Sequence, residues 1–199
     1  MKLQRTAPGV AELRVVRPLR RAIPNREEGC RRTRPLDTIR NSMKASVYIE
    51  TTIPSYYTSL PSRDVVIAGH QVTTRDWWER RLPHFRPFVS QVVLDEAASG
   101  NAVFARRRLE VLAPFPILEL RDEVIELANA FINGGPLPKK AARDALHIAA
   151  AATHGLDFLV TWNCTHIANA EMNPKIVTIC HDHGLECPVI CTPEELMGA

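Results

Sequence analysis

The sequence predicts an α/β fold with a central, mostly parallel sheet that is covered by helices on both faces. Short apolar, β-prone segments alternate with longer segments of helical periodicity, which is the pattern of parallel strands joined by crossover helices. The segment DFLVTW, residues 157–162, has the nearly continuous hydrophobicity of a strand that is buried on both faces. With 199 residues, of which 45% are hydrophobic, the chain is long enough for one domain with a real core.

The elements of this fold follow from local patterns, taken in chain order. The first strand is expected at residues 45–49, which are apolar and β-prone, and Pro54 is expected to stop regular structure after it. Next come a helix over 64–81 closed by Pro83, a strand over 88–94 that runs into a helix near Asp95, a helix over 102–111 and a short strand over 115–120. The last elements are helices over 121–133 and from 138 or 139 to about 154, a strand over 157–162, a mostly helical segment over 165–184, a strand over 188–192 and a helical turn over 193–196.

The first 42 residues differ from the rest of the chain in charge. They hold 11 basic and 4 acidic side chains, whereas the remaining residues hold 14 basic and 18 acidic ones. This composition predicts a basic, disordered extension at 1–42 and a compact domain at 43–199. A nucleic-acid-binding arm and an Arg-rich transit peptide are two functional interpretations of the extension. We expect instead that Met43 is the native start, because MKASVYIETT opens directly into the first strand.

The sequence gives no sign of a membrane or secreted protein. Its apolar runs are far shorter than the roughly 20 residues of a membrane span. No apolar stretch of the signal-peptide type follows the basic N-terminus. Five cysteines in a chain of this length favour reduced thiols over a disulfide framework. We therefore expect a cytoplasmic protein that does not bind a membrane.

Acidic and amide side chains follow the expected strands at their carboxyl ends. Glu50 ends the first strand, Asp95 and Glu96 end the second, and Asn163 follows DFLVTW. Asp144 lies in the first turns of the Ala-rich helix that precedes this last strand. Because ligand sites in parallel sheets gather at the carboxyl edge, we expect these side chains to lie close together there.

Such a cluster is costly without a cation. Two carboxylates about 4 Å apart repel by about 4 kcal/mol at an effective dielectric near 20, so that one of them would take up a proton. Oxygen ligands without His or Cys suit Mg²⁺ or Mn²⁺ rather than Zn²⁺, and such ions activate water and stabilise the leaving oxygen in phosphodiester cleavage. Glu50 is then a metal ligand, and Thr51 or Thr52 orients it or contacts a phosphate.

Four segments resemble, in their order, the motifs of a known family. They are SVYIETTIPSYY, VVLDEAASG, ARDALHIAAAATHGLDFLVTWN and THIAN, and together they are similar to the motifs of PIN-domain proteins, notably the VapC-type toxins of type II toxin–antitoxin pairs. The resemblance covers about residues 45–193. It implies a PIN-like fold, a Mg²⁺- or Mn²⁺-dependent endoribonuclease with three or four acidic ligands, a homodimer, and an antitoxin partner that silences it.

Carried over residue by residue, the resemblance places the first acid at Glu50, the second at Glu96, the third at Asp144 and the fourth position at Asn163. The three acids would bind the metal and Asn163 would assist, with Asp95 as an alternative to its neighbour. The first and fourth positions are usually Asp in this family. Glu50 is one methylene longer and would shift the metal, whereas Asn163 removes a negative charge and would bind a cation more weakly.

Two other functions remain open at this stage. The weakened fourth position is compatible with a catalytically weak module that binds RNA or a partner protein without cutting. A DNA-directed, structure-specific nuclease is a third hypothesis, because no residue pattern in the chain separates RNA from DNA.

Each candidate also has a purely structural explanation. Glu50 is in that case an ordinary exposed strand end. Glu96 and Asp144 would be acids in the first turn of a helix, where the helix dipole favours them. Asp95 is expected as the N-cap of its helix, and Asn163 would cap the helix that follows it.

Several other residues are expected to be structural. His147 and His166 accompany the acids, but most histidines in such places are structural residues with satisfied hydrogen bonds. The Cys and His residues between 180 and 191 match no zinc-binding spacing. Residues 106–108 are three consecutive arginines, for which a solvated helix face is expected rather than a track for RNA phosphates.

Overall fold

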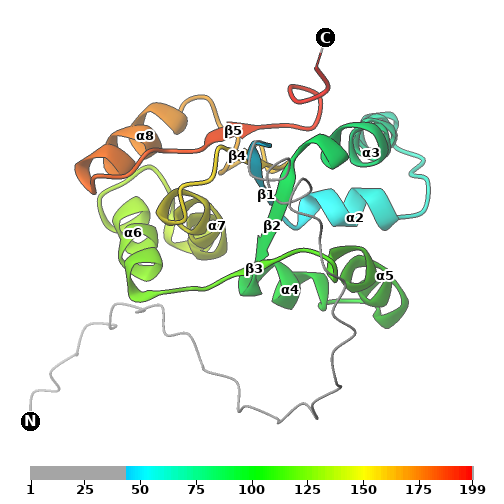
Figure 1. The fold of residues 1–199 in the computed structure, drawn as a ribbon, viewed down its shortest axis with the longest axis horizontal. Helices are drawn as coiled ribbons and strands as arrows, with labels where there is room; N and C mark the ends of the chain where they lie inside the picture. The colour runs from blue at the N-terminus through cyan, green and yellow to red at the C-terminus, as the bar shows by residue number, and fades with distance from the viewer. Residues whose placement is uncertain (1–43, 199) are drawn as a thin grey trace, which may run out of the picture. The chain divides into compact units, whose positions relative to one another are not determined.

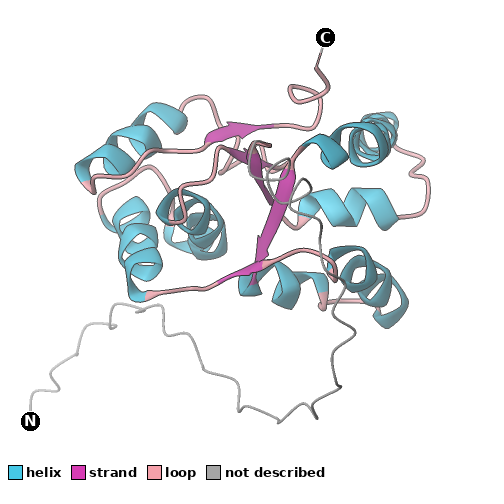
Figure 2. Cartoon of the chain, in the orientation of Figure 1, coloured by secondary structure: helices cyan, strands magenta, loops and turns pink. Residues whose placement is uncertain are grey.

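The computed structural model describes residues 44–198, and their centre is a five-stranded sheet (Figures 1 and 2). The sheet has the strand order β3-β2-β1-β4-β5, and every pair of neighbouring strands is parallel. The expected extension at 1–42, together with Met43, lies outside the described residues. The strands are β1 (Ser46–Ile49), β2 (Arg86–Ser90), β3 (Ile117–Leu118), β4 (Phe158–Val160) and β5 (Val189–Cys191).

Helices lie on both faces of this sheet, which confirms the predicted α/β class. Figure 1 shows α6, α7 and α8 on one side of the strands and α2, α3 and α5 on the other. The helices are α2 (Thr52–Thr58), α3 (Val65–Asp76), α4 (Gln91–Ala97), α5 (Ala102–Leu112), α6 (Asp122–Asn133), α7 (Ala142–Thr153) and α8 (Asn173–Asp182). A π-helical turn, η1 (Trp77–Arg81), and two 3₁₀ turns, η2 (Leu82–His84) and η3 (Lys139–Ala141), complete the regular structure.

The prediction of a strand over 88–94 was wrong beyond Ser90. The strand ends there, and Gln91 begins helix α4. The β-branched Val92 and Val93 favour a strand locally, but both are buried by packing of the helix, and this packing outweighs their propensity. Glu96 therefore lies in the last turn of α4 rather than in a first turn, and Asp95 is not an N-cap.

Two further predictions were wrong near the ends of elements. Pro54 does not stop regular structure, because it lies in the first turn of α2, where the missing N–H has no helical acceptor to lose. The predicted helix over 165–184 is shorter, since α8 begins at Asn173 after a stretch of turns. The expected helical turn at 193–196 is a hydrogen-bonded turn, closed by the Leu196 N–H on the Pro193 carbonyl at 3.2 Å.

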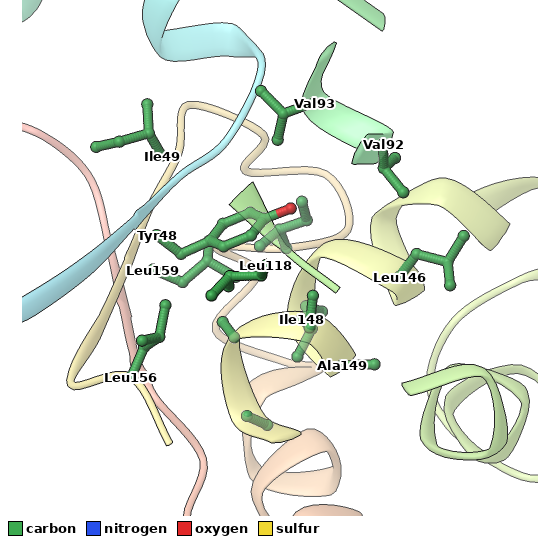
Figure 3. Close-up of a cluster of buried hydrophobic side chains, with 14 of the residues drawn as sticks. Tyr48, Ile49, Val92, Val93, Leu118, Leu146, Ile148, Ala149, Leu156 and Leu159 are labelled. Carbon is green, nitrogen blue, oxygen red and sulfur yellow. The ribbon is translucent and has the colours of Figure 1, made fainter. Parts of the chain in front are cut away.

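β1 is the central strand, and it is fully buried. Tyr48 is in register with Phe88 of β2 on one side and with Leu159 of β4 on the other. Figure 3 shows the Tyr48 ring, with its hydroxyl oxygen in red, among apolar side chains of several elements. The alanines of α7 are small enough for this helix to pack closely against the core: Ala145, Ala149, Ala150, Ala151 and Ala152 are all buried.

No helix within residues 44–198 has the length and apolar character that crossing a membrane requires. The cysteines in this part of the chain, Cys164, Cys180, Cys187 and Cys191, are free thiols.

Candidate metal centre

The carboxyl edge of the sheet brings together the residues that follow β1, β2 and β4. Glu50 follows β1, Glu96 comes from α4 after β2, and Thr161 follows β4. Helix α7 adds Asp144 from its first turn and His147 one turn later, on the same face. From the parallel topology, the sequence predicted that Glu50, Glu96, Asp144 and Asn163 would gather at this edge; of the acids, Glu50 and Glu96 fall in one group with His147.

Glu50 is buried, and one of its carboxylate oxygens is held firmly. Its Oε2 accepts hydrogen bonds from the Thr52 hydroxyl at 2.5 Å, the Thr161 hydroxyl at 2.7 Å and the Thr52 N–H at 3.1 Å. Each hydroxyl also accepts a backbone N–H, from Trp162 and Asn163, so its own proton points at Glu50. No described residue donates to the other oxygen, Oε1, which leaves it free for an additional partner.

Glu96 stands opposite Glu50 and is held by three different groups. The Thr51 hydroxyl donates to its Oε2 at 2.5 Å, and His147 Nε2 lies 3.1 Å from the same oxygen. The Arg143 guanidinium lies 3.7 Å from Oε1. Burial alone would raise the pKa of Glu96, but the hydrogen bonds from His147 and Thr51 and the nearby Arg143 guanidinium hold that pKa below its ordinary value.

His147 is the inner end of a buried chain of hydroxyl groups. Its Nδ1 lies 2.8 Å from the Tyr48 hydroxyl, which lies 2.6 Å from the Ser90 hydroxyl. All three side chains are inaccessible to solvent or nearly so. Burial raises the pKa of Tyr48 far above its ordinary value, so its hydroxyl keeps its proton. If Tyr48 donates to Nδ1, the imidazole proton is on Nε2 and is donated to Glu96, because a carboxylate only accepts.

The N-cap residues of two helices form hydrogen bonds within this cluster instead of capping their own helices. Thr51 precedes α2 and Ser90 precedes α4, both at the N-cap position, yet neither side chain caps its helix. The Thr51 hydroxyl donates to Glu96, and the Ser90 hydroxyl pairs with Tyr48. A side-chain cap stabilises a helix by about 1 kcal/mol, so both helices forgo this stabilisation in favour of the site.

Asp144 is not one of the three grouped ligand residues and forms a second cluster with Asn163 and His166. Its Oδ1 accepts from the Asn163 amide at 3.0 Å, and its Oδ2 lies 2.8 Å from His166 Nδ1. Asn163 in turn accepts the His166 backbone N–H at 3.2 Å, so it does contribute to a local turn. Both carboxylate oxygens of Asp144 therefore already have partners within the chain.

The first cluster has the donor set of a divalent cation site. Glu50, Glu96 and His147 each offer one ligand atom, and these three atoms lie within 4.8 Å of one another. Two carboxylates at that separation repel by about 3.5 kcal/mol at an effective dielectric near 20. A divalent ion between them would remove this repulsion, and the free Oε1 of Glu50 supplies an oxygen for it. The residues present therefore fit a metal ion.

A pocket of about 410 Å³ opens beside Glu96. Tyr56 and Arg143 line it together with Glu96, and the Arg143 guanidinium lies 3.7 Å from the Glu96 carboxylate. A positive charge and an aromatic ring beside an acid are the groups that contact the phosphates and bases of a single-stranded nucleic acid. Its lining residues are Thr51, Thr52, Ser55, Tyr56, Glu96, Ser99 and Arg143.

The sequence identified part of this site. Thr51 and Thr52 orient the two acids, Thr52 acting on Glu50 and Thr51 on Glu96. Asp95, in contrast, is exposed and accepts the Gln91 amide at 2.7 Å, away from the cluster. The closeness of His147 to both acids was missed, although its position three residues after Asp144 on one helix was a usable signal. The hydrogen bonds of Tyr48 with Ser90 and His147 could not be predicted from the sequence, because Tyr48 and Ser90 have the pattern of ordinary strand residues.

The other residues singled out in the sequence have structural roles. The Cys and His residues between 180 and 191 do not form a group with metal-ligand spacing in the described part of the chain. Arg106 pairs with Glu110 at 2.8 Å, and Arg107 lies over the Phe104 ring at 5.5 Å. Arg108 donates to the carbonyls of Ala97 and Ser99 after α4, so it stabilises the end of that helix.

Comparisons with known proteins gave few matches. No family model and no curated protein matches the chain. Among solved structures, a chain of the VapBC2 complex from Rickettsia felis, crystallised with a DNA fragment from its promoter, is similar with a TM-score of 0.46. The identity is 15%, and the similarity covers 73% of this chain and 97% of that one. At this degree of similarity, the match assigns no activity or partner to the chain.

Proposed function

We propose that the chain is a metal-dependent phosphodiester hydrolase, an endoribonuclease of the PIN type. The observation that carries this proposal is the meeting of Glu50 and Glu96 at the carboxyl edge of a parallel sheet, with their ligand atoms and that of His147 within 4.8 Å of one another. The two acids come from different segments, and the hydroxyl of Thr51, next to Glu50, bonds Glu96 across 45 residues of chain. Such an arrangement is costly unless a cation occupies it.

Glu50 and Glu96 would hold the ion, which we propose to be Mg²⁺ or Mn²⁺. When bound, such an ion activates water and neutralises the charge that develops on a phosphodiester during cleavage. Thr52 and Thr161 keep the Glu50 carboxylate in place, with Oε1 free. Asp144 would be the third acid at the carboxyl edge of the sheet, and a hydrogen bond from the Asn163 amide orients its carboxylate.

We propose RNA as the substrate. The Arg143 guanidinium lies in the pocket wall beside Glu96, where it would attract a phosphate, and the nearby Tyr56 ring offers a face on which a base would stack. Because Arg143 is largely exposed, its contact with Glu96 is readily exchanged for one with a substrate phosphate.

We also propose that the chain is the toxin of a toxin–antitoxin pair and forms a homodimer, as the resemblance of its motifs implies. Helix α3 supports the existence of a protein partner. Val65, Val66 and Val72 of this helix are 85%, 66% and 64% exposed, and an uncovered apolar helix face is typical of an interaction surface.

A binding module that does not cut RNA is the second candidate function. The observation in its favour is the Asp144–Asn163–His166 cluster, in which Asn163 and His166 occupy both oxygens of the third acid. In that case the pocket beside Glu96 would bind RNA without cleaving it.

Cleavage by the full chain of a panel of RNA and single-stranded DNA, with Mn²⁺, Mg²⁺ or EDTA, tests these alternatives. We expect metal-dependent cutting of RNA that falls at least 100-fold in Asp144→Asn, while circular dichroism shows that the fold is intact. Asp122→Asn is the matched control, since Asp122 is an acid in the first turn of the neighbouring helix α6. Equal cutting by Asp144→Asn and wild type would remove Asp144 from the mechanism. RNA binding without cutting would favour the binding module, and cutting of DNA alone would favour a DNA-directed nuclease.

A further inference from the structure

We propose that His147 is itself a ligand of the ion, through Nε2, so that the site consists of two carboxylates and one imidazole. This inference rests on the proposed metal site and goes beyond its three acids. It makes the site selective for Mn²⁺ over Mg²⁺, because imidazole is a good ligand for transition metals, whereas Mg²⁺ prefers oxygen.

The positions of the ligand atoms support this assignment. His147 Nε2 lies 3.1 Å from Glu96 Oε2. Ligands that are each about 2.1 Å from an octahedral ion and at right angles to each other lie about 3.0 Å apart, so these two atoms already have the spacing of neighbouring ligands. Glu50 completes the group of three within 4.8 Å and has a free oxygen, whereas Asp144 is not a member of that group.

The far side of the imidazole is also arranged as in a metal-binding histidine. Such a residue donates its second ring N–H to a fixed acceptor, which sets the tautomer and the ring orientation. The Tyr48 hydroxyl lies 2.8 Å from Nδ1 in the fully buried core and is fixed in turn by Ser90 at 2.6 Å. The ring therefore presents Nε2 to the two carboxylates and has little freedom to turn away.

The hydroxyl chain supports both tautomers of the ring. Without the ion, Ser90 donates to Tyr48, Tyr48 donates to Nδ1, and Nε2 donates to Glu96. In the tautomer that binds an ion, Nε2 has lost its proton and Nδ1 carries one, which it donates to Tyr48. Tyr48 then donates to Ser90. Both hydroxyls change direction by rotation. Between the two arrangements the ring releases the Nε2 proton to solvent and takes one up at Nδ1, so the number of protons on the ring is unchanged.

Pulsed electron paramagnetic resonance of the Mn²⁺-loaded full chain is the direct test, because it detects the nitrogen nucleus of a ligating imidazole without requiring activity. We expect a ¹⁴N coupling in the wild type, its retention in His166→Gln and its loss in His147→Gln. Bound Mn²⁺ without ¹⁴N coupling would overturn the proposal. Loss of the coupling in His166→Gln but not in His147→Gln would show that His166 is the ligand, which would also overturn the proposal.

Metal titrations of the same variants test the selectivity. We expect the Mn²⁺ dissociation constant to rise at least tenfold in His147→Gln and the Mg²⁺ constant to rise less than threefold. His154→Gln is the matched control, since His154 follows the same helix and its ring lies 2.8 Å from the Glu119 carbonyl rather than from the two acids. Equal losses for both ions in His147→Gln would contradict the selectivity.

Tyr48→Phe keeps the proposal testable if His147→Gln does not fold. It removes only the hydroxyl, so we expect the ¹⁴N coupling to remain and Mn²⁺ affinity to fall about 10- to 100-fold, as for other outer partners of metal-bound histidines. Unchanged Mn²⁺ affinity in a folded Tyr48→Phe would contradict the role of the hydroxyl chain. A ¹⁴N coupling in a protein that cuts no nucleic acid would preserve this site and overturn only the proposed nuclease activity.

Discussion

The two polar clusters at the carboxyl edge differ in how their carboxylates are satisfied. In the Asp144 cluster, Asn163 and His166 occupy both oxygens of a single acid, and the arrangement is complete without any other group. In the Glu50 cluster, two acids face each other, and one oxygen of Glu50 receives no hydrogen bond from the described chain. The first arrangement is self-sufficient, whereas the second has a place for a cation.

This difference indicates that the residue type at position 163 decides which carboxylate is paired within the chain. Asn163 supplies an N–H donor where a carboxylate would supply only acceptors. It thereby pairs Asp144 within the chain, whereas Glu50 keeps one oxygen to which no described residue donates. His147 is the buried neighbour of Glu96 in that second cluster.

The largest effect is expected from removing the charge of Glu96. Glu96→Gln keeps the size of the side chain but removes one of the two facing carboxylates, so we expect Mn²⁺ binding to weaken at least 100-fold and RNA cleavage to fall as far. Isothermal calorimetry and a cleavage assay measure both. Asp95→Asn, on the exposed face of the same helix, is the matched control, and a similar loss in this variant would refute the distinction between the two acids.

A smaller effect is expected from making the two clusters alike. Asn163→Asp places a second carboxylate about where the amide now donates to Asp144 at 3.0 Å. The repulsion should lower the free energy of unfolding by about 1–3 kcal/mol in EDTA, and Mn²⁺ at 100 times its dissociation constant should restore about 2.7 kcal/mol. Thermal unfolding with and without Mn²⁺ checks this. Equal stability of the variant and the wild type in EDTA would show that the Asp144 cluster tolerates charge without an ion.

The smallest effect concerns stability in acid. The pKa of Glu96 is held below its ordinary value of 4.5, so the folded protein binds fewer protons than the unfolded chain. Its stabilising contribution is therefore present above about pH 4.5 and is lost as the pH falls through the lowered folded value. We expect urea unfolding between pH 6 and pH 3 to depend less steeply on pH in Glu96→Gln than in the wild type.

Asp157 provides the comparison for this acid effect. Its pKa is held below the ordinary 3.8, mainly by the Ser46 hydroxyl and backbone N–H, and it lies at the start of β4, away from the site. Asp157→Asn should weaken the pH dependence in a lower window and leave Mn²⁺ binding unchanged. A pH dependence in Glu96→Gln as steep as in the wild type would show that the Glu96 carboxyl does not titrate differently in the two states.

The sequence predicted the parts of the fold that depend on hydrophobic pattern. The buried strands and the Ala-rich helix have unambiguous patterns, and the positions of Glu50, Asp144 and Asn163 followed from them. The start of α4 did not, because Val92 and Val93 favour a strand until the packing of the folded chain is taken into account. The sequence did not predict helix α2, because Pro54 was expected to stop regular structure. A proline is tolerated in the first turn of a helix, where it lies here, and disrupts a helix only further along.

The candidate site was predictable only where it follows from topology. Parallel strands deliver their last residues to one edge, so the acids could be grouped without coordinates. The hydroxyl chain behind His147 depends on which side chains meet inside the core. Tyr48, Ser90 and His147 come from three elements, and no local pattern in the sequence links them.

The central position of β1 has a consequence for synthesis on the ribosome. Tyr48 meets Ser90 across 42 residues of chain and His147 across 99, and Glu50 meets Thr161 across 111. At 5–20 residues per second, translation brings the last of these partners out roughly 6 to 22 s after the first acid. The buried central strand is therefore synthesised before the residues that hold its side chains. If a ribosome stalls before β4, its nascent chain contains Glu50 but not yet Thr161, whose hydroxyl donates to Glu50.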